Sequence, residues 1–225
     1  MASYENVTLR EQLHLDRRVL RLALLMLGLS GFGAGLAMII ESGLGAAPWD
    51  VLHVALAQLT GASIGTVVIV MSLLVLLAWI PLRQSPGIGT LANALWVGVA
   101  IDATLAVLPT ATTLTAQTAM LLGGILLNGA AGAVYIGALL GPGPRDGVMT
   151  GLHLRFGLPI APVRIGLEVL VLATGWLLGG PVGLGTLAYA LLIGPITHLV
   201  LPHVVVPVRR GPAPTPFASQ GTIGS

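Results

Sequence analysis

The chain has no cysteine, no lysine and few charged residues of any kind. Of its 225 residues, 8% are charged and 55% are hydrophobic, and the mean hydropathy is +0.95. A soluble domain carries about 25% charged residues, so this chain lacks the groups needed to cover a surface facing water. Intrinsic disorder is excluded because disordered chains are polar and charged. The composition therefore predicts a membrane protein that crosses the bilayer several times.

The absence of cysteine excludes disulfides, thiolate metal sites and cysteine nucleophiles. Because lysine is absent too, all 10 basic residues are arginines. Most of them lie in short connections or tails, a pattern typical of membrane topology rather than of nucleic-acid binding. We therefore expect the lipid bilayer as a partner, and no nucleic acid.

Six apolar segments are each long enough to cross about 30 Å of hydrocarbon. They are residues 19–40, 64–80, 88–108, 119–140, 162–178 and 183–201. The sequence thus predicts an all-α membrane protein with six transmembrane helices and a membrane domain over residues 19–206. A cytoplasmic segment at 1–18 is predicted to precede this domain. A cytoplasmic tail at 207–225, rich in proline and small polar residues, follows it and is expected to be disordered.

Connections that contain arginine alternate with connections that do not. The arginines lie before or at the start of span one, between spans two and three, between four and five or at the start of five, and after six: Arg10, Arg17, Arg18, Arg21, Arg83, Arg145, Arg155, Arg164, Arg209 and Arg210. Because cytoplasmic connections carry the excess of basic residues, both termini are predicted to be cytoplasmic. Three tryptophans fall near the predicted boundaries, where aromatic belts are expected: Trp49, Trp79 and Trp176.

The chain contains an internal repeat at an offset of 96 residues. Residues 23–105 align without a gap on residues 119–201. In this alignment, Gly45-Ala-Ala-Pro-Trp-Asp50 lies on Gly141-Pro-Gly-Pro-Arg-Asp146. Each copy, about 19–108 and about 119–201, holds three spans. Because three is odd, the second copy enters the membrane from the opposite side, and the sequence predicts two inverted repeats.

A short segment follows each Pro-x-Asp motif. Residues 49–59 and 145–155 are moderately apolar but too short to cross a bilayer. Proline suits the first turn of a helix, and an aspartate there favours the helix dipole. We predict two half-helices that are either re-entrant or interfacial. The alternative is an ordinary surface helix that links two spans.

These motifs resemble the YczE-like branch of the YczE/YyaS/YitT bacterial membrane proteins. The residues that carry the resemblance include Gly43-Leu-Gly-Ala-Ala-Pro-Trp-Asp-Val-Leu52, Pro144-Arg-Asp-Gly-Val-Met-Thr-Gly-Leu152, Glu168, Gly183-Leu-Gly-Thr186 and Ile193-Gly-Pro195. The resemblance covers about residues 19–201. It implies a small bacterial inner-membrane protein with several spans, and it implies neither an activity nor catalytic residues.

Asp102 in span three and His198 in span six are repeat mates at membrane depth. Ionisable groups are costly there, so each is a candidate functional residue. An acid and an imidazole related by the repeat could form a proton relay or bind a cation. The alternative is a buried hydrogen-bonded pair, or two groups that face water near opposite interfaces.

Arg164 and Glu168 are one turn apart on span five, a spacing that allows an ion pair on one helix face. The pair is a candidate gate or anchor for an anionic group. The simpler interpretation is that the two charges neutralise each other near the cytoplasmic end.

Asp50 and Asp146 are the matched acids of the repeat, and we predict that they cap the two half-helices. In the alternative interpretation, the positive N-terminal ends of the half-helices bind an anion. An aspartate at such an end works against an anionic ligand, and Arg145 could offset this at the second half-helix only. His53 is one turn after Asp50, so the two side chains are expected to pair.

Thr90 and Thr186 follow matched Gly-x-Gly motifs. They either line a pathway or satisfy backbone carbonyls where helices approach closely. No histidine pair has a third ligand at helix-face spacing, so neither a metal site nor another cofactor is expected.

The function favoured by this pattern is a secondary transporter or exporter of a small solute. Inverted repeats with paired short helices are typical of proteins in which discontinuous helices build a central site. Asp50 and Asp146 would then hold two gates on opposite sides of one pathway. The alternative is a non-catalytic scaffold or regulatory partner, in contact with a second copy or another membrane protein. An enzyme is not expected, because the chain lacks a recognisable nucleophile, base and orienting group.

Overall fold

The computed structural model describes residues 16–207, and all the regular structure in that range is helical. Its helices are α2 (Arg18–Glu41), α3 (Pro48–Thr60), α4 (Ile64–Leu77), α5 (Trp79–Leu82), α6 (Ile88–Leu105), α7 (Leu114–Gly137), α8 (Pro144–Phe156), α9 (Ile160–Leu177) and α10 (Leu184–Val204). The predictions for residues 1–15 and 208–225, including most of the disordered tail, lie outside the described residues.

Six candidate spans are present, as predicted. Five are single helices, and the remaining one joins α4 to the short α5 over Ile64–Leu82. The largest difference from the prediction is in α7, which begins at Leu114 rather than at residue 119. The Thr113 side chain sets this start by accepting a hydrogen bond from the Ala116 N–H at 3.3 Å.

α2 and α7 form the centre of the bundle, and their backbones are in close contact. A Cβ atom added to Gly28 would stand 2.5 Å from the Tyr135 nitrogen, and one added to Gly35 would stand 2.7 Å from the Asn128 nitrogen. Small residues allow membrane helices to approach this closely. α6 packs on α2 and α10 packs on α7, so the central pair has a neighbour on each side.

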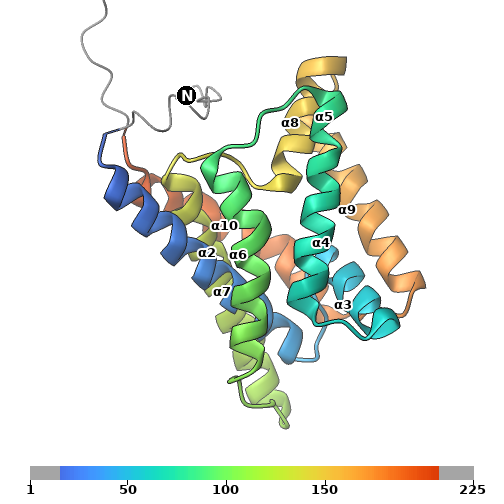
Figure 1. Ribbon diagram of the computed structural model, residues 1–225. Coiled ribbons are helices and arrows are strands. Elements are labelled where there is room, and N and C mark those ends of the chain that lie inside the picture. Colours follow the sequence, from blue (N-terminus) through green and yellow to red (C-terminus); the bar gives the residue numbers. More distant parts are fainter. Residues whose placement is uncertain (1–15, 208–225) are drawn as a thin grey trace, which may run out of the picture.

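The two short helices lie at opposite ends of the bundle. Figure 1 places α8 beside α5 at one end and α3 near the other. α9 packs mainly against α3, where Gly175 lets the α9 backbone approach the backbone of Leu52. The position of α9 therefore depends on the short helices.

Both ends of the described chain lie at the same end of the bundle as α5 (Figure 1). Arg21 is fully buried there, and its terminal nitrogens donate to the Ala138 carbonyl at 3.0 Å and the Pro207 carbonyl at 3.3 Å. It thereby ties α2 to the end of α7 and to the residues after α10. We refer to this end, which carries Arg18, Arg21 and Arg83, as the arginine-rich end.

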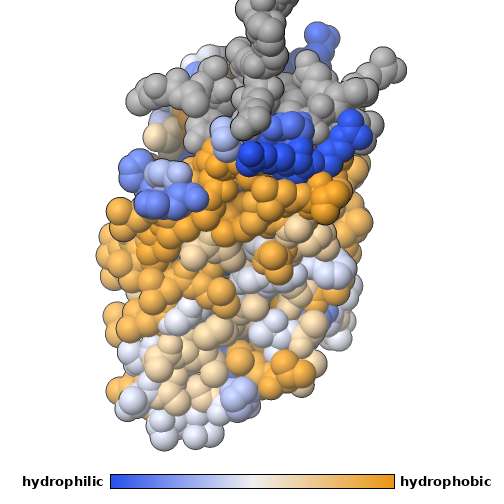
Figure 2. Space-filling model, turned by 90° about the vertical axis from the view of Figure 1, so that its left-hand side faces the viewer, coloured by the Kyte–Doolittle hydropathy of each residue, from blue (hydrophilic) through white to orange (hydrophobic). Residues whose placement is uncertain are grey.

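Apolar side chains cover much of the outside of the spans. Among the large exposed ones are Val19, Leu74, Leu126 and Leu177. Figure 2 shows a broad hydrophobic surface, with hydrophilic side chains gathered next to it at one end of the molecule. An apolar surface of this extent suits lipid rather than water.

Candidate functional site

The short helices α3 and α8 begin beside each other. Each has a proline as its first residue, Pro48 in α3 and Pro144 in α8. The second residues are in contact, because the guanidinium carbon of Arg145 lies 4.6 Å from the centre of the Trp49 ring. Since a helix N-terminus carries partial positive charge, this contact brings two positive ends to one region of the bundle.

A cavity of about 390 Å³, which we call the central cavity, lies at this junction. Its polar lining comprises Trp49, Ser72, Asn93, Tyr135, Arg145, Asp146, Arg164, Glu168, Tyr189, Thr197 and His198. Five of these are site residues predicted from the sequence: Arg145, Asp146, Arg164, Glu168 and His198. Within residues 16–207, no three His, Asp or Glu side chains gather closely enough to hold a metal ion.

Arg164 and Glu168 form the ion pair predicted from their spacing. The Arg164 Nε donates to the Glu168 Oε1 at 2.9 Å. Both side chains lie on α9 and line the central cavity. The pair therefore places one positive and one negative charge in the same wall.

Asp146 is the other carboxyl group in the lining of the central cavity. Burial raises the pKa of Asp146 above its ordinary value, and this outweighs the opposing effect of two nearby arginines and a backbone N–H. These opposing groups are Arg145, Arg164 and the Gly143 N–H, while the Glu168 charge adds to the increase. This carboxyl is thus easier to protonate than an aspartate in water.

Asp50 and His53 pair within α3, as expected. The His53 Nδ1 and the Asp50 Oδ1 are 2.9 Å apart, and both side chains are buried away from the central cavity. Burial lowers the pKa of His53 and outweighs the effect of the neighbouring carboxylate. The second carboxylate oxygen, Asp50 Oδ2, has no hydrogen-bond partner among the described residues.

The prediction that Asp50 and Asp146 cap their helices is wrong. Ala47 and Gly143 hold the N-cap positions. Because proline is the first helical residue in both cases, each aspartate falls two residues further in. A carboxylate at that position still interacts favourably with the helix dipole.

Asp102 binds the start of α4 rather than a histidine. Its Oδ1 accepts a hydrogen bond from the Gly65 N–H at 2.7 Å, and its Oδ2 accepts one from the Ser63 hydroxyl at 2.6 Å. His198 instead lines the central cavity. The two repeat mates form no relay, because Asp102 is held in the contact between α4 and α6.

Thr90 and Thr186 lie in the first turns of α6 and α10 and not in the cavity lining. The Thr90 hydroxyl donates to the Pro142 carbonyl at 2.7 Å, and the Thr186 hydroxyl accepts from the Gly183 N–H at 3.3 Å. Of the two predicted roles, the structure favours satisfaction of backbone groups over lining of a pathway.

Backbone hydrogen bonds beside these threonines join the two halves of the chain. The Gly89 N–H donates to the Leu140 carbonyl at 2.7 Å, and the Gly185 N–H donates to the Leu44 carbonyl at 2.8 Å. Both residues of the second bond are 96 positions from their mates in the first. Each half therefore receives the same contact from the other.

Two of the three tryptophans predicted for the boundaries have other roles. Trp79 is buried against Gly147, and its Nε1 donates to the Pro144 carbonyl at 2.9 Å, which holds the start of α8. Trp49 lines the central cavity beneath Arg145. Trp176 is exposed on α9, as a boundary tryptophan would be. A position near a predicted span boundary therefore did not distinguish the exposed Trp176 from the two tryptophans that make internal contacts.

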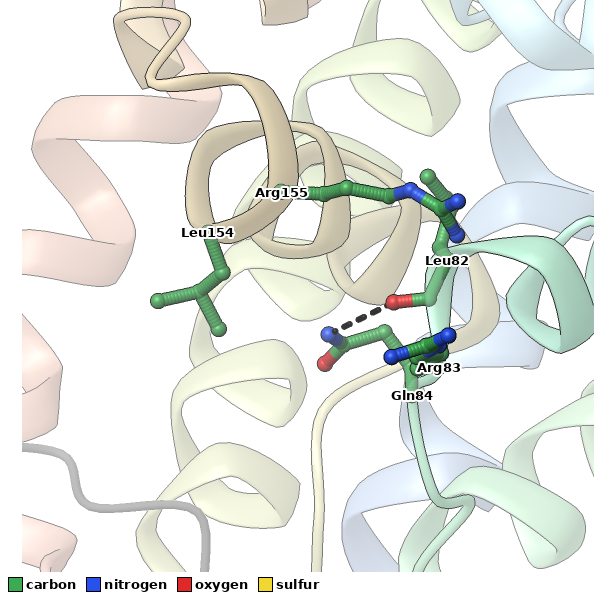
Figure 3. A pocket seen from close by; sticks show the side chains of 5 residues that line it. All are labelled: Leu82, Arg83, Gln84, Leu154 and Arg155. Carbon is green, nitrogen blue, oxygen red and sulfur yellow. Dashed lines mark hydrogen bonds between the residues drawn. The ribbon is translucent and has the colours of Figure 1, made fainter.

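A second hollow of about 360 Å³ lies between the end of α5 and the last turns of α8. Its lining consists of Leu82, Arg83, Gln84, Leu154 and Arg155, drawn in Figure 3. The one polar contact drawn there is local, from the Gln84 Nε2 to the Leu82 carbonyl at 3.4 Å. This hollow shares no lining residue with the central cavity.

Comparison with known proteins places the chain among bacterial relatives whose names state no activity. A family described as "Family of unknown function (DUF6198)" matches residues 19–202. A Haemophilus influenzae protein named "Uncharacterized protein" is 40% identical over 189 residues, or 81% of this chain and 87% of that protein. "Uncharacterized membrane protein YczE" of Bacillus subtilis is 35% identical, over 83% of this chain and 88% of its own length. "Uncharacterized protein YyaS" of Bacillus subtilis is 28% identical over 82% and 96%, respectively. No solved structure matches this chain significantly.

Proposed function

Because this chain belongs to the DUF6198 family, which is defined without an activity, we propose its function from its own geometry: a secondary transporter or exporter of a small solute. The resemblance to YczE and YyaS that the motifs predicted is confirmed. The observation that carries the proposal is the central cavity, which lies where the starts of α3 and α8 meet. A packed interior without such a cavity would instead have favoured a scaffold. We propose no catalytic role.

In this proposal the chain consists of two inverted three-helix repeats. The matched hydrogen bonds Gly89–Leu140 and Gly185–Leu44 support it, since they are what a pseudo-two-fold axis between the halves requires. The bounds of α3 and α8 support it as well, because they correspond across the repeat. Each helix begins at the proline of a repeated motif and ends before a glycine. The two short helices would be re-entrant, with their N-termini at the binding site.

Of the contacts that differ between the two repeats, the one between their last two spans suggests alternating access. The backbones of α4 and α6 are in close contact at Gly65 and Gly98. A Cβ on either glycine would meet the carbonyl oxygen of the other. The corresponding pair, α9 and α10, pack mainly against α3 and α7. At Gly194, the mate of Gly98, no described atom lies within 4 Å of the position of a Cβ. The cavity would thus be closed between α4 and α6 and open between α9 and α10.

This asymmetry assigns a role to Asp102. Its two bonds to Ser63 and Gly65 hold α4 against α6 at the end remote from the arginines. A hydrogen bond to a charged group contributes about 1.5–3 kcal/mol. Loss of one such bond would shift a balanced two-state equilibrium about tenfold or more. We propose that Asp102 acts as the latch of the closed side.

The latch can be tested with cysteine at Ser72, which lines the central cavity on α4. The chain has no native cysteine, so each single-cysteine variant reports one position. In inverted vesicles and in intact cells, a membrane-impermeant thiol reagent should label Ser72→Cys from the arginine-rich end only. Adding Asp102→Ala should increase labelling from the other end at least tenfold.

Thr104→Ala is the matched control, because the Thr104 hydroxyl on the same helix donates only to the Ala100 carbonyl of α6, at 2.7 Å. It should leave labelling unchanged from both ends. Equal labelling of Ser72→Cys from both sides without the Asp102 substitution would contradict alternating access. A failure of the reagent to label Ser72→Cys from either side, in every variant, would contradict it too.

The proposed topology places both termini and the arginine-rich end in the cytoplasm of a bacterium, in its inner membrane. The alternation of arginines supports this orientation. Cysteine at Arg83 should react only with reagent on the cytoplasmic side, and cysteine at Thr112 only with reagent outside. Labelling of Thr112→Cys from the cytoplasm alone would refute the orientation.

A further inference from the structure

Asp146 is the carboxyl group in the lining of the central cavity that has no ion-pair partner among the described residues. The other carboxylate there, Glu168, is paired with Arg164. Arg145 precedes Asp146 in the chain, and its guanidinium lies over the Trp49 ring. Neither arginine that lines the cavity therefore forms a direct ion pair with Asp146, although both guanidinium charges act on it from a distance.

Two further polar groups lie close to Gly143, as the Asp146 carboxyl does. A Cβ added to Gly143 would stand 3.3 Å from the Asp146 Oδ2, 3.4 Å from the Tyr135 hydroxyl and 3.6 Å from the Asn93 amide nitrogen. Tyr135 is only 6% exposed and lines the cavity, and its hydroxyl is not among the fully buried groups without a hydrogen-bond partner in residues 16–207, so it is open to the cavity. A hydroxyl and an amide that open onto the cavity, next to a carboxyl without a direct ion pair, indicate a site that accepts a ligand from the cavity.

We propose that Asp146 is the proton-binding site that couples transport to a proton gradient. A proton can bind the Asp146 carboxyl with no requirement for further ligands. A metal cation fits this site poorly, because two guanidinium groups lie nearby and only one unpaired carboxylate is present. The inference rests on the proposed transport function, for which it names the coupling ion.

The position of Asp146 explains how proton binding would act on the conformation. It lies on α8, and the charges of Arg164 and Glu168 on α9 act on it across the cavity. Removal of its charge changes the attraction between α8 and α9. Since α9 borders the open side of the cavity, protonation biases the equilibrium between open and closed states.

Other titratable groups face the same cavity and have to be separated from Asp146 in any pH measurement. They are Arg145 on α8, Arg164 and Glu168 on α9, Tyr135 on α7, and Tyr189 and His198 on α10. Of these, histidine is the one whose ordinary pKa lies near neutral pH. His198→Gln and Glu168→Gln are therefore the controls.

Infrared difference spectra of the full chain in detergent, recorded between acidic and alkaline pH, test the proposal directly. A protonated carboxyl gives a carbonyl band that a carboxylate lacks, and the wild-type chain should lose a band at a pH above that of an ordinary aspartate. Asp146→Asn should abolish this band, while the two control variants retain it. Asp146→Glu should keep a band at a changed frequency, which provides a second test should Asp146→Asn not fold.

A band that persists in Asp146→Asn, or its absence from the wild-type chain, would overturn the inference. Loss of the band on addition of sodium chloride at constant pH would do the same, because it would indicate a sodium site. The spectra require no transport, so these outcomes leave the Ser72 labelling result untouched. Failure of that labelling would refute transport while the proton site stands.

Discussion

Gly35→Ala should lower the free energy of unfolding by about 1–3 kcal/mol, and Gly28→Ala should do the same. The new methyl group of Gly35→Ala would stand 2.7–2.8 Å from backbone and side-chain atoms of Asn128 and from the Gly124 carbonyl. These atoms belong to α7, so the helices have to separate at the centre of the bundle. Denaturation in a detergent series or by thermal melting measures the change. The double variant should have a lower free energy of unfolding than either single variant.

Gly166→Ala on α9 is the matched control for the glycine substitutions. No atom of another described element lies within 4 Å of the position of its Cβ, so helix propensity is the main change. Propensity favours alanine over glycine by about 1 kcal/mol, so this variant should be unchanged or slightly more stable. If all three variants had equal stability, the close contact between α2 and α7 would not be a determinant of the fold.

Arg21→Gln should lower the free energy of unfolding by about 3 kcal/mol or more. Arg21 is fully buried, and its guanidinium satisfies the carbonyls of Ala138 and Pro207 as well as the Asp16 carboxylate at 3.2 Å. Glutamine cannot reach all these acceptors. Thermal melting should show the loss, and limited proteolysis should show earlier release of the segment that follows α10.

Arg83→Gln separates the loss of these hydrogen bonds from the loss of a positive charge. Arg83 lies at the same end of the molecule but is exposed. Its replacement removes one positive charge from that end and should change stability by less than about 0.5 kcal/mol. A stability loss in Arg83→Gln as large as that in Arg21→Gln would show that net charge, and not the buried hydrogen bonds, is responsible.

The sequence by itself determined the class of protein, the number of spans and the positions of the short helices. Length and hydropathy suffice to identify a span, because a bilayer requires a fixed length of apolar helix. The starts of α3 and α8 were predictable because Pro48 and Pro144 act locally, through the fixed backbone angle of proline. The pairs Asp50–His53 and Arg164–Glu168 were predictable because one helical turn separates their members.

Only the tertiary structure decided which polar residues of different helices meet. Arg145 contacts Trp49, Asp102 holds the start of α4, and Arg21, which the sequence analysis counted among the connecting arginines, is buried in the first turn of α2. Each of these contacts depends on how a helix is rotated about its axis. The spans are apolar on every side, so their periodicity does not indicate which face points inward. Helix rotation is set instead by backbone contact at glycines, such as Gly28 and Gly35 against α7, and such contacts become visible only when the helices are packed together.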